Sequence, residues 1–201
     1  MMMGLMKTSV IHAMAMSLGV LLWLCVAVPG ASAVQDSNPT GTPEDKTPIT
    51  LATDSKTNVI IYHAPDAPIS VQMAAKELAR ILRAATGATF EIRTEPATPM
   101  ISLGSNDSAK SVGLDGASMP EESFRILTRD QNVYIVGHDT RDDQRTARGG
   151  RSWGTSYGVS TFLERAVNVR WLMPGPVGEV IPQQSSLTIS SLDIIEKPDF
   201  A

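Results

Sequence analysis

A long amphipathic segment, Ser70–Thr86, limits the possible folds more than any other part of the sequence. Its apolar residues recur at intervals of three and four, which places them on one face of a helix. They are Val71, Ala74, Ala75, Leu78, Ile81, Leu82 and Ala85. Ser70 is a candidate N-cap, and Gly87 stands where a left-handed C-terminal cap belongs. Apolar runs at 58–62 and 90–93 predict flanking strands, so the helix is expected to pack on a sheet.

The remaining periodic segments extend this pattern to an α+β domain. The pair 123–127 and 132–136 alternates apolar and polar residues around a short polar link, which is typical of a β-hairpin. Further strands are predicted at 100–103, 169–172 and 186–195, and a second helix at 156–167. Polar loops are predicted at 104–121 and 137–155. Because helices and strands do not alternate throughout, we expect a mixed sheet with two helices packed on one face.

The first 33 residues have the pattern of a secretory signal peptide. Lys7 supplies a positive charge, Leu18–Val28 is an apolar stretch too short to span a membrane, and Ala31–Ala33 is a small-residue cleavage site. We therefore expect a secreted or periplasmic protein, cleaved near Ala33, with no stable membrane anchor. Residues 34–57 are rich in Thr, Pro, Asp and Ser and are expected to form a disordered leader, so that folding starts near Asn58.

Composition and motifs exclude several function classes. The formal net charge of −4 argues against nucleic acid as a partner. No phosphate-binding glycine loop, no zinc-binding histidine pair and no recognisable pair of catalytic carboxylates occurs, so no cofactor, metal or catalytic residue is predicted. His63 and His138 each follow a predicted strand, and Asp139, Asp142 and Asp143 share the loop 137–155. A solvated loop is the simpler interpretation of these acids, because arginines interleave with them.

One cluster near the C-terminal end carries more information. Gly158 lies inside the second predicted helix, where glycine costs about 1 kcal/mol against alanine, so a close approach of the helix to the sheet is expected. Arg170 and Trp171 follow on a predicted strand and precede a turn rich in proline and glycine. They are the candidate ligand or interface residues, Arg170 as a partner for a carboxylate and Trp171 as an apolar anchor. The alternative for Trp171 is a simple core position.

These segments together resemble the N-terminal α/β domain that precedes the catalytic barrel in α-glucuronidases and in related exported bacterial glycoside-hydrolase-like proteins. The corresponding domain of β-hexosaminidases has the same architecture. The resemblance covers 58–200 and depends on the order and spacing of several short motifs. They are AAKELARILRAATGATFEI (74–92), ISLG (101–104), ESFRI (122–126), VYIVGHD (133–139), YGVSTFLE (157–164), VRWLMPGPVGE (169–179) and EKPDF (196–200). Residues 140–153 look inserted relative to that pattern.

The resemblance implies a hexosaminidase-like accessory domain over 58–201, whose partner is a (β/α)8 barrel that carries the catalytic carboxylates. The chain ends about where that barrel would begin, so a fragment or a truncated product is expected, inactive alone although the full-length relatives are glycoside hydrolases. A polysaccharide is a further candidate partner. An independent carbohydrate-binding or cell-surface module is the alternative, and an exposed row of aromatic side chains would favour it. A small enzyme using His138 and the acidic loop is a third hypothesis.

Overall fold

The computed structural model describes residues 47–199, and the predicted signal peptide lies outside them. A six-stranded sheet has the order β10-β5-β6-β4-β2-β3. Its strands are β2 (Ile60–His63), β3 (Ile92–Arg93), β4 (Met100–Leu103), β5 (Phe124–Arg129), β6 (Asn132–Gly137) and β10 (Asp193–Glu196). Strands β3, β2, β4 and β6 are parallel neighbours, whereas β5 is antiparallel to both β6 and β10. The expected α+β class with a mixed sheet is therefore confirmed.

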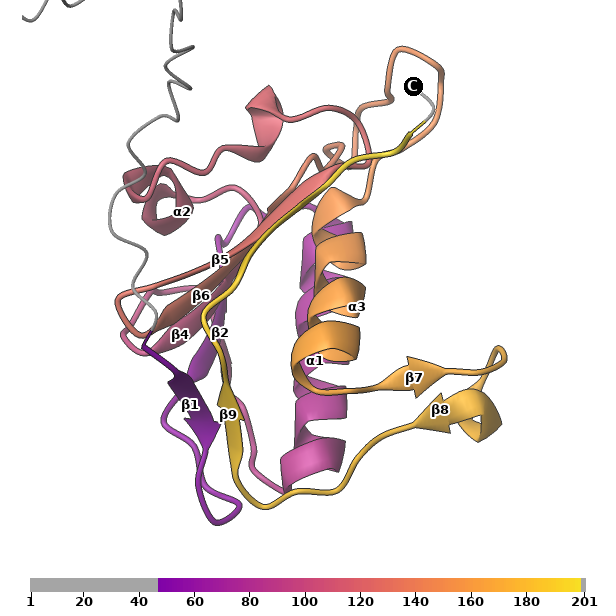
Figure 1. Ribbon diagram of the computed structural model, residues 1–201. Coiled ribbons are helices and arrows are strands. Elements are labelled where there is room, and N and C mark those ends of the chain that lie inside the picture. The colour runs from indigo at the N-terminus through magenta and orange to yellow at the C-terminus, as the bar shows by residue number, and fades with distance from the viewer. Residues whose placement is uncertain (1–46, 200–201) are drawn as a thin grey trace, which may run out of the picture. The chain divides into compact units, whose positions relative to one another are not determined.

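Two long helices, α1 (Ile69–Thr86) and α3 (Gly154–Ala166), lie side by side on one face of this sheet, as Figure 1 shows. Every apolar residue predicted for the inner stripe of α1 is buried. Gly87 adopts a left-handed conformation with φ of 76° and donates its N–H to the Arg83 carbonyl at 2.8 Å. The helix begins after Pro68, however, and the Ser70 side chain makes no capping bond. The periodicity thus located the helix and its buried face but not its N-cap.

Gly158 lets α3 approach the sheet as closely as expected. A Cβ atom built there would lie 2.7 Å from Ile135 Cγ2 and 3.2 Å from Phe124 Cδ2. Both neighbours are buried, Ile135 on β6 and Phe124 on β5. Glycine is therefore required by packing at this position.

The opposite face of the sheet carries a second, smaller core that the sequence did not predict. Within the predicted loop 104–121 the chain forms α2 (Asp107–Ser111) and the 3₁₀ turn η1 (Gly116–Ser118). Asn106 caps α2, because its side-chain oxygen accepts the Ala109 N–H at 3.0 Å. The buried apolar residues of this side are Ile60, Tyr62, Met100, Ala109, Leu114, Tyr134 and Val136. Sheet and helices thus form two unequal cores rather than one.

Two boundary predictions are wrong. Folding does not start near Asn58, since β1 (Ile49–Ala52) lies within the predicted leader and pairs with β9 (Leu187–Ile189). Ile49, Leu51 and Ala52 are buried in the main core, which keeps this strand in place. The strand predicted over 186–195 is two strands, because the chain leaves β1 after β9 and then pairs with β5 as β10. Residues 34–46 of the predicted leader lie outside the described part.

Candidate docking surface

A short arm projects from the end of α3, away from the two helices (Figure 1). It consists of β7 (Arg170–Trp171), the 3₁₀ turn η2 (Pro176–Gly178) and β8 (Glu179–Val180), and we call residues 170–180 the arm. Strand β7 pairs with β8 alone and does not join the six-stranded sheet. The tip is closed by the Leu172 N–H, which donates to the Gly178 carbonyl at 2.9 Å. The arm is thus an ordered feature with its own hydrogen bonds.

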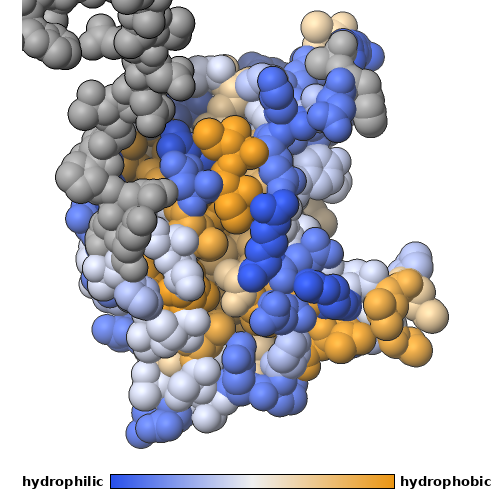
Figure 2. All heavy atoms as spheres, viewed as in Figure 1, coloured by the Kyte–Doolittle hydropathy of each residue, from blue (hydrophilic) through white to orange (hydrophobic). Residues whose placement is uncertain are grey.

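The side chains at the tip of the arm are apolar and exposed to solvent. Leu172 is 73%, Met173 56% and Val177 91% exposed, and Val180 on β8 is exposed as well. Figure 2 shows the arm as an apolar projection beside a mostly polar surface. Scattered exposed apolar residues are ordinary, but a contiguous group on a projecting element is typical of an interaction surface.

The two residues predicted from the sequence lie at the base of this arm. Arg170 is exposed, and its Nη1 donates to the carbonyls of Glu164 at 2.9 Å and Val169 at 2.8 Å. Its bond to Glu164 satisfies a carbonyl in the last turn of α3, where positive charge is favourable. Trp171 is half-buried and packs against the main core. The structure brings both to the arm, whereas the exposed tip residues Leu172, Met173 and Val177 were not among the candidates chosen from the sequence.

A charged clamp ties the arm to α1. The guanidinium of Arg80 donates to Glu179 Oε1 at 2.7 Å and Oε2 at 3.0 Å, and to Glu77 Oε1 at 2.7 Å and Oε2 at 2.9 Å. Two bidentate contacts match the planar fork of arginine. These hydrogen bonds raise the pKa of Arg80, and the bond from Arg80 lowers the pKa of Glu77. The clamp fixes the direction of the arm relative to the helix layer.

A second exposed apolar group lies at the N-terminal ends of the two helices. Ile69 and Met73 are one turn apart on α1, and Trp153 and Tyr157 are similarly spaced at the start of α3. The helices are joined here, because Ser156 Oγ donates to the Ser70 carbonyl at 3.2 Å. A hollow of about 460 Å³ runs between the helices, with Met73 and Trp153 among its walls. We call these four residues the helix-face group.

The acids and histidines of the predicted loops serve mainly as caps and local anchors. Asp142 accepts the Ile69 N–H at 3.0 Å and so caps α1 from the loop 137–155. Asp139 accepts the backbone N–H and the hydroxyl of Thr155 at the start of α3. Burial raises the pKa of Asp139 to about 6, although both hydrogen bonds oppose this shift. His63 Nδ1 lies 2.8 Å from the Ala64 carbonyl, whereas His138 Nδ1 is buried without a partner.

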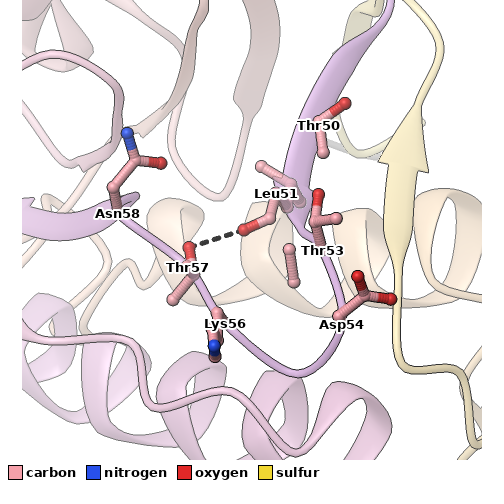
Figure 3. A pocket seen from close by; sticks show the side chains of 8 residues that line it. Thr50, Leu51, Thr53, Asp54, Lys56, Thr57 and Asn58 are labelled. Atoms are coloured by element: carbon pink, nitrogen blue, oxygen red, sulfur yellow. Dashed lines mark hydrogen bonds between the residues drawn. The ribbon is translucent and has the colours of Figure 1, made fainter.

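Within residues 47–199 no cluster of three potential metal ligands occurs. A hollow of about 500 Å³ beside β1 is lined by one continuous segment, 50–58, which Figure 3 shows closed by a hydrogen bond from Thr57 Oγ1 to the Leu51 carbonyl at 2.6 Å. Its charged residues are Asp54 and Lys56, and it contains no pair of acids. No helix in the described part of the chain is long and apolar enough to cross a membrane.

No family model matches the sequence, and no curated protein matches it. Solved structures do share the fold. A GH20 β-N-acetylhexosaminidase from Streptomyces coelicolor A3(2) matches 78% of this chain with a TM-score of 0.50 at 18% identity. A GH115 4-O-methyl-α-glucuronidase with specificity for decorated arabinogalactans matches 75% of this chain with a TM-score of 0.48 at 16% identity. The N-acetyl-β-hexosaminidase of Streptomyces plicatus matches 78% of this chain with a TM-score of 0.47 at 15% identity.

The chain spans 24% of the first of these proteins, 18% of the second and 24% of the third. The fold resemblance stated from the sequence motifs is thereby confirmed. The chain corresponds in fold to a small part of much longer glycoside hydrolases.

Proposed function

We propose that the protein is an exported, non-catalytic accessory domain of a glycoside-hydrolase-like protein, and that the arm docks on a neighbouring catalytic barrel. The observation that carries the proposal is the group of exposed apolar side chains on the arm. Such side chains gain about 25 cal/mol for each Å² that a partner removes from water. The similarity in fold to part of a much longer hexosaminidase supports a catalytic domain as that partner.

The anchoring of the arm supports the same proposal. An interface element contributes most when little conformational freedom is lost on binding. The Arg80 clamp and the partly buried Trp171 hold the arm before any partner arrives. The remaining donors of the exposed Arg170 guanidinium are available to a carboxylate of the partner. Trp171 then supports the tip from inside, and Leu172, Met173 and Val177 make the contact.

The helix-face group favours a second candidate function, an independent carbohydrate-binding or cell-surface module. Trp153 and Tyr157 are 41% and 48% exposed, and flat aromatic rings stack on sugars. Five other aromatic residues are buried: Tyr62, Phe90, Phe124, Tyr134 and Phe162. The exposed pair is thus confined to one end of α3. The same residues would equally extend the docking surface, and experiment can separate the two functions.

Hydroxyl-radical footprinting of methionines provides this test. Met173 on the arm and Met73 on α1 are each 56% exposed, while the buried Met100 is a matched control within the same chain. In the isolated chain we expect rapid oxidation of Met173 and Met73 and slow oxidation of Met100. In a protein that also carries the catalytic domain, Met173 is expected to be protected.

Protection of Met73 as well would assign the helix face to the same interface. Continued oxidation of Met73 beside a protected Met173 would leave the helix face open for carbohydrate. Equal oxidation of Met173 with and without the catalytic domain would contradict the proposal.

A further inference from the structure

Strands β2 and β4 are parallel neighbours, and the connections that follow them lead toward opposite edges of the sheet. From β2 the chain passes through α1 to β3 on one side. From β4 it passes through α2 to β5 and β6 on the other side. In open sheets with parallel strands, ligands bind in the crevice that such a reversal leaves outside the carboxyl ends of the strands. This topology directs attention to the segments that follow β2, β4 and β6.

A cavity of about 200 Å³ lies at this place. Its walls come from the segment after β2 with Asp66, the segment after β4 with Gly104 and Ser105, and the segment after β6 with Asp139 and Arg141. Val71 of α1 lies beneath the cavity and is only 1% exposed. Gly104 has a φ of 71°, so the chain turns sharply where the cavity opens beyond β4. With Gly116 and Ala117 of η1, the cavity is built from four separate segments, three of which follow the parallel strands β2, β4 and β6.

Its polar groups have unused hydrogen-bonding capacity. Asp139 accepts two hydrogen bonds, both from Thr155, whereas a carboxylate can accept about four. Arg141 Nη1 lies 3.9 Å from Asp66 Oδ2, which is beyond a hydrogen bond. Among residues 47–199 the Arg141 guanidinium makes no hydrogen bond, so its donors face solvent or a ligand. Acceptors and donors thus line one small space.

We propose that this cavity binds a single pyranose ring, with its hydroxyl groups between the acids Asp66 and Asp139 and the guanidinium of Arg141. Two carboxylates disfavour an anion, and the arginine disfavours a metal cation, so a neutral ligand rich in hydroxyl groups fits the charge pattern. The small volume suits one ring rather than a chain, because sites for drug-sized ligands measure about 300–1,000 Å³. The site is separate from the arm and does not depend on the docking function.

Titration of the isotope-labelled full chain by NMR tests this site. The probes are methyl β-D-glucopyranoside, N-acetylglucosamine and sodium glucuronate. We expect saturable shifts of the Gly104, Ser105 and Gly137 amides with at least one of the two neutral sugars. Asp66→Ala and Arg141→Ala, both at exposed positions, should each weaken that binding at least fivefold. Arg145→Ala, in the same loop but not in the cavity wall, is the control and should bind as the wild type does.

Three results of the wild-type titration would overturn the proposal. They are the absence of saturable shifts with either neutral sugar, binding restricted to glucuronate, and shifts that centre on Trp153 and Tyr157 instead of the cavity. Unchanged affinity in both Asp66→Ala and Arg141→Ala would do so too. Because the titration uses the chain without a catalytic domain, its failure leaves the footprinting of Met173 unaffected, and the two proposals fail separately.

Discussion

Replacement of Gly158 by alanine has two effects of known size, which change the free energy of unfolding in opposite directions. In an ordinary exposed helix, Gly→Ala stabilises by about 1 kcal/mol, because alanine loses less backbone freedom on folding. Here the added methyl group would lie 2.7 Å from Ile135 Cγ2 and 3.2 Å from Phe124 Cδ2. Ile135 is fully buried and cannot withdraw, so the methyl group must displace α3 or the sheet. Overpacking of this kind costs about 1–3 kcal/mol.

The second effect is expected to win, with a net loss of up to about 2 kcal/mol in the free energy of unfolding. For a domain of this size the midpoint of thermal unfolding should fall by up to about 8 °C. Circular dichroism with urea and heat measures both quantities. Ser160→Ala, at an exposed position of the same helix, is the matched control and should be neutral or slightly stabilising.

A double-mutant cycle isolates the contact. Ile135→Ala removes the atom that the new methyl group would meet and costs about 2–5 kcal/mol by itself. If the clash is real, Gly158→Ala should cost less in the Ile135→Ala background than alone, by about 1 kcal/mol. A Gly158→Ala protein more stable than the wild type would refute the close approach of α3 to the sheet.

Four further predictions concern the export signal, the lack of hydrolytic activity, the arm and the buried acid. Mass spectrometry of secreted material should find a mature N-terminus at Val34, and an intact Met1 would contradict the signal peptide. The purified chain should hydrolyse no aryl glycoside, and turnover that survives repurification would contradict an accessory role. Trp171→Ala should cost about 1–3 kcal/mol of unfolding free energy in the isolated chain, less than the 3–5 of a fully buried ring, because Trp171 is half-buried. Folding raises the pKa of Asp139 from 3.8 to about 6, so the folded chain holds this proton more tightly than the unfolded chain does. As the pH rises from 4 to 6, the wild type should therefore lose up to about 3 kcal/mol of unfolding free energy relative to Asp139→Asn. Urea titrations measure this difference, and equal pH profiles of the two proteins would contradict a buried Asp139.

The sequence predicted those parts of the fold whose signals are local. The stripe of α1 has five helical turns to establish its period, and all its predicted members are buried. The β5–β6 hairpin was recognised because two alternating runs flank a short link, and Asp130 and Gln131 at its turn both have positive φ. The close packing at Gly158 followed from the cost of glycine within a helix.

The sequence failed where an element depends on a distant partner or is very short. Strand β1 has four residues, and its partner β9 is far away in the chain, so nothing local distinguishes it from a leader. Helix α2 has five residues, too few for a period, although Asn106 before Asp107 is a capping signal that could have been noticed. One alternating run over 186–195 could not reveal that its two halves pair with different strands.

The sequence pointed to the base of the arm but not to the side chains at its tip. Arg170 and Trp171 lie at the base of the arm, as a strand followed by a Pro-Gly turn suggested. The tip residues could not be chosen individually, because their exposure depends on whether β7 joins the main sheet or only pairs with β8, and both alternatives fit the predicted strand 169–172. The cavity beyond β2, β4 and β6 needs the strand order, which no local pattern contains.

The nucleotide sequence that follows codon 201 tests the central claim most directly. An accessory domain with an apolar docking arm requires a catalytic domain, and we predict that the reading frame continues past Ala201 into a glycoside-hydrolase barrel. A stop codon directly after Ala201, with no glycoside-hydrolase catalytic domain encoded by an adjacent gene, would contradict the account.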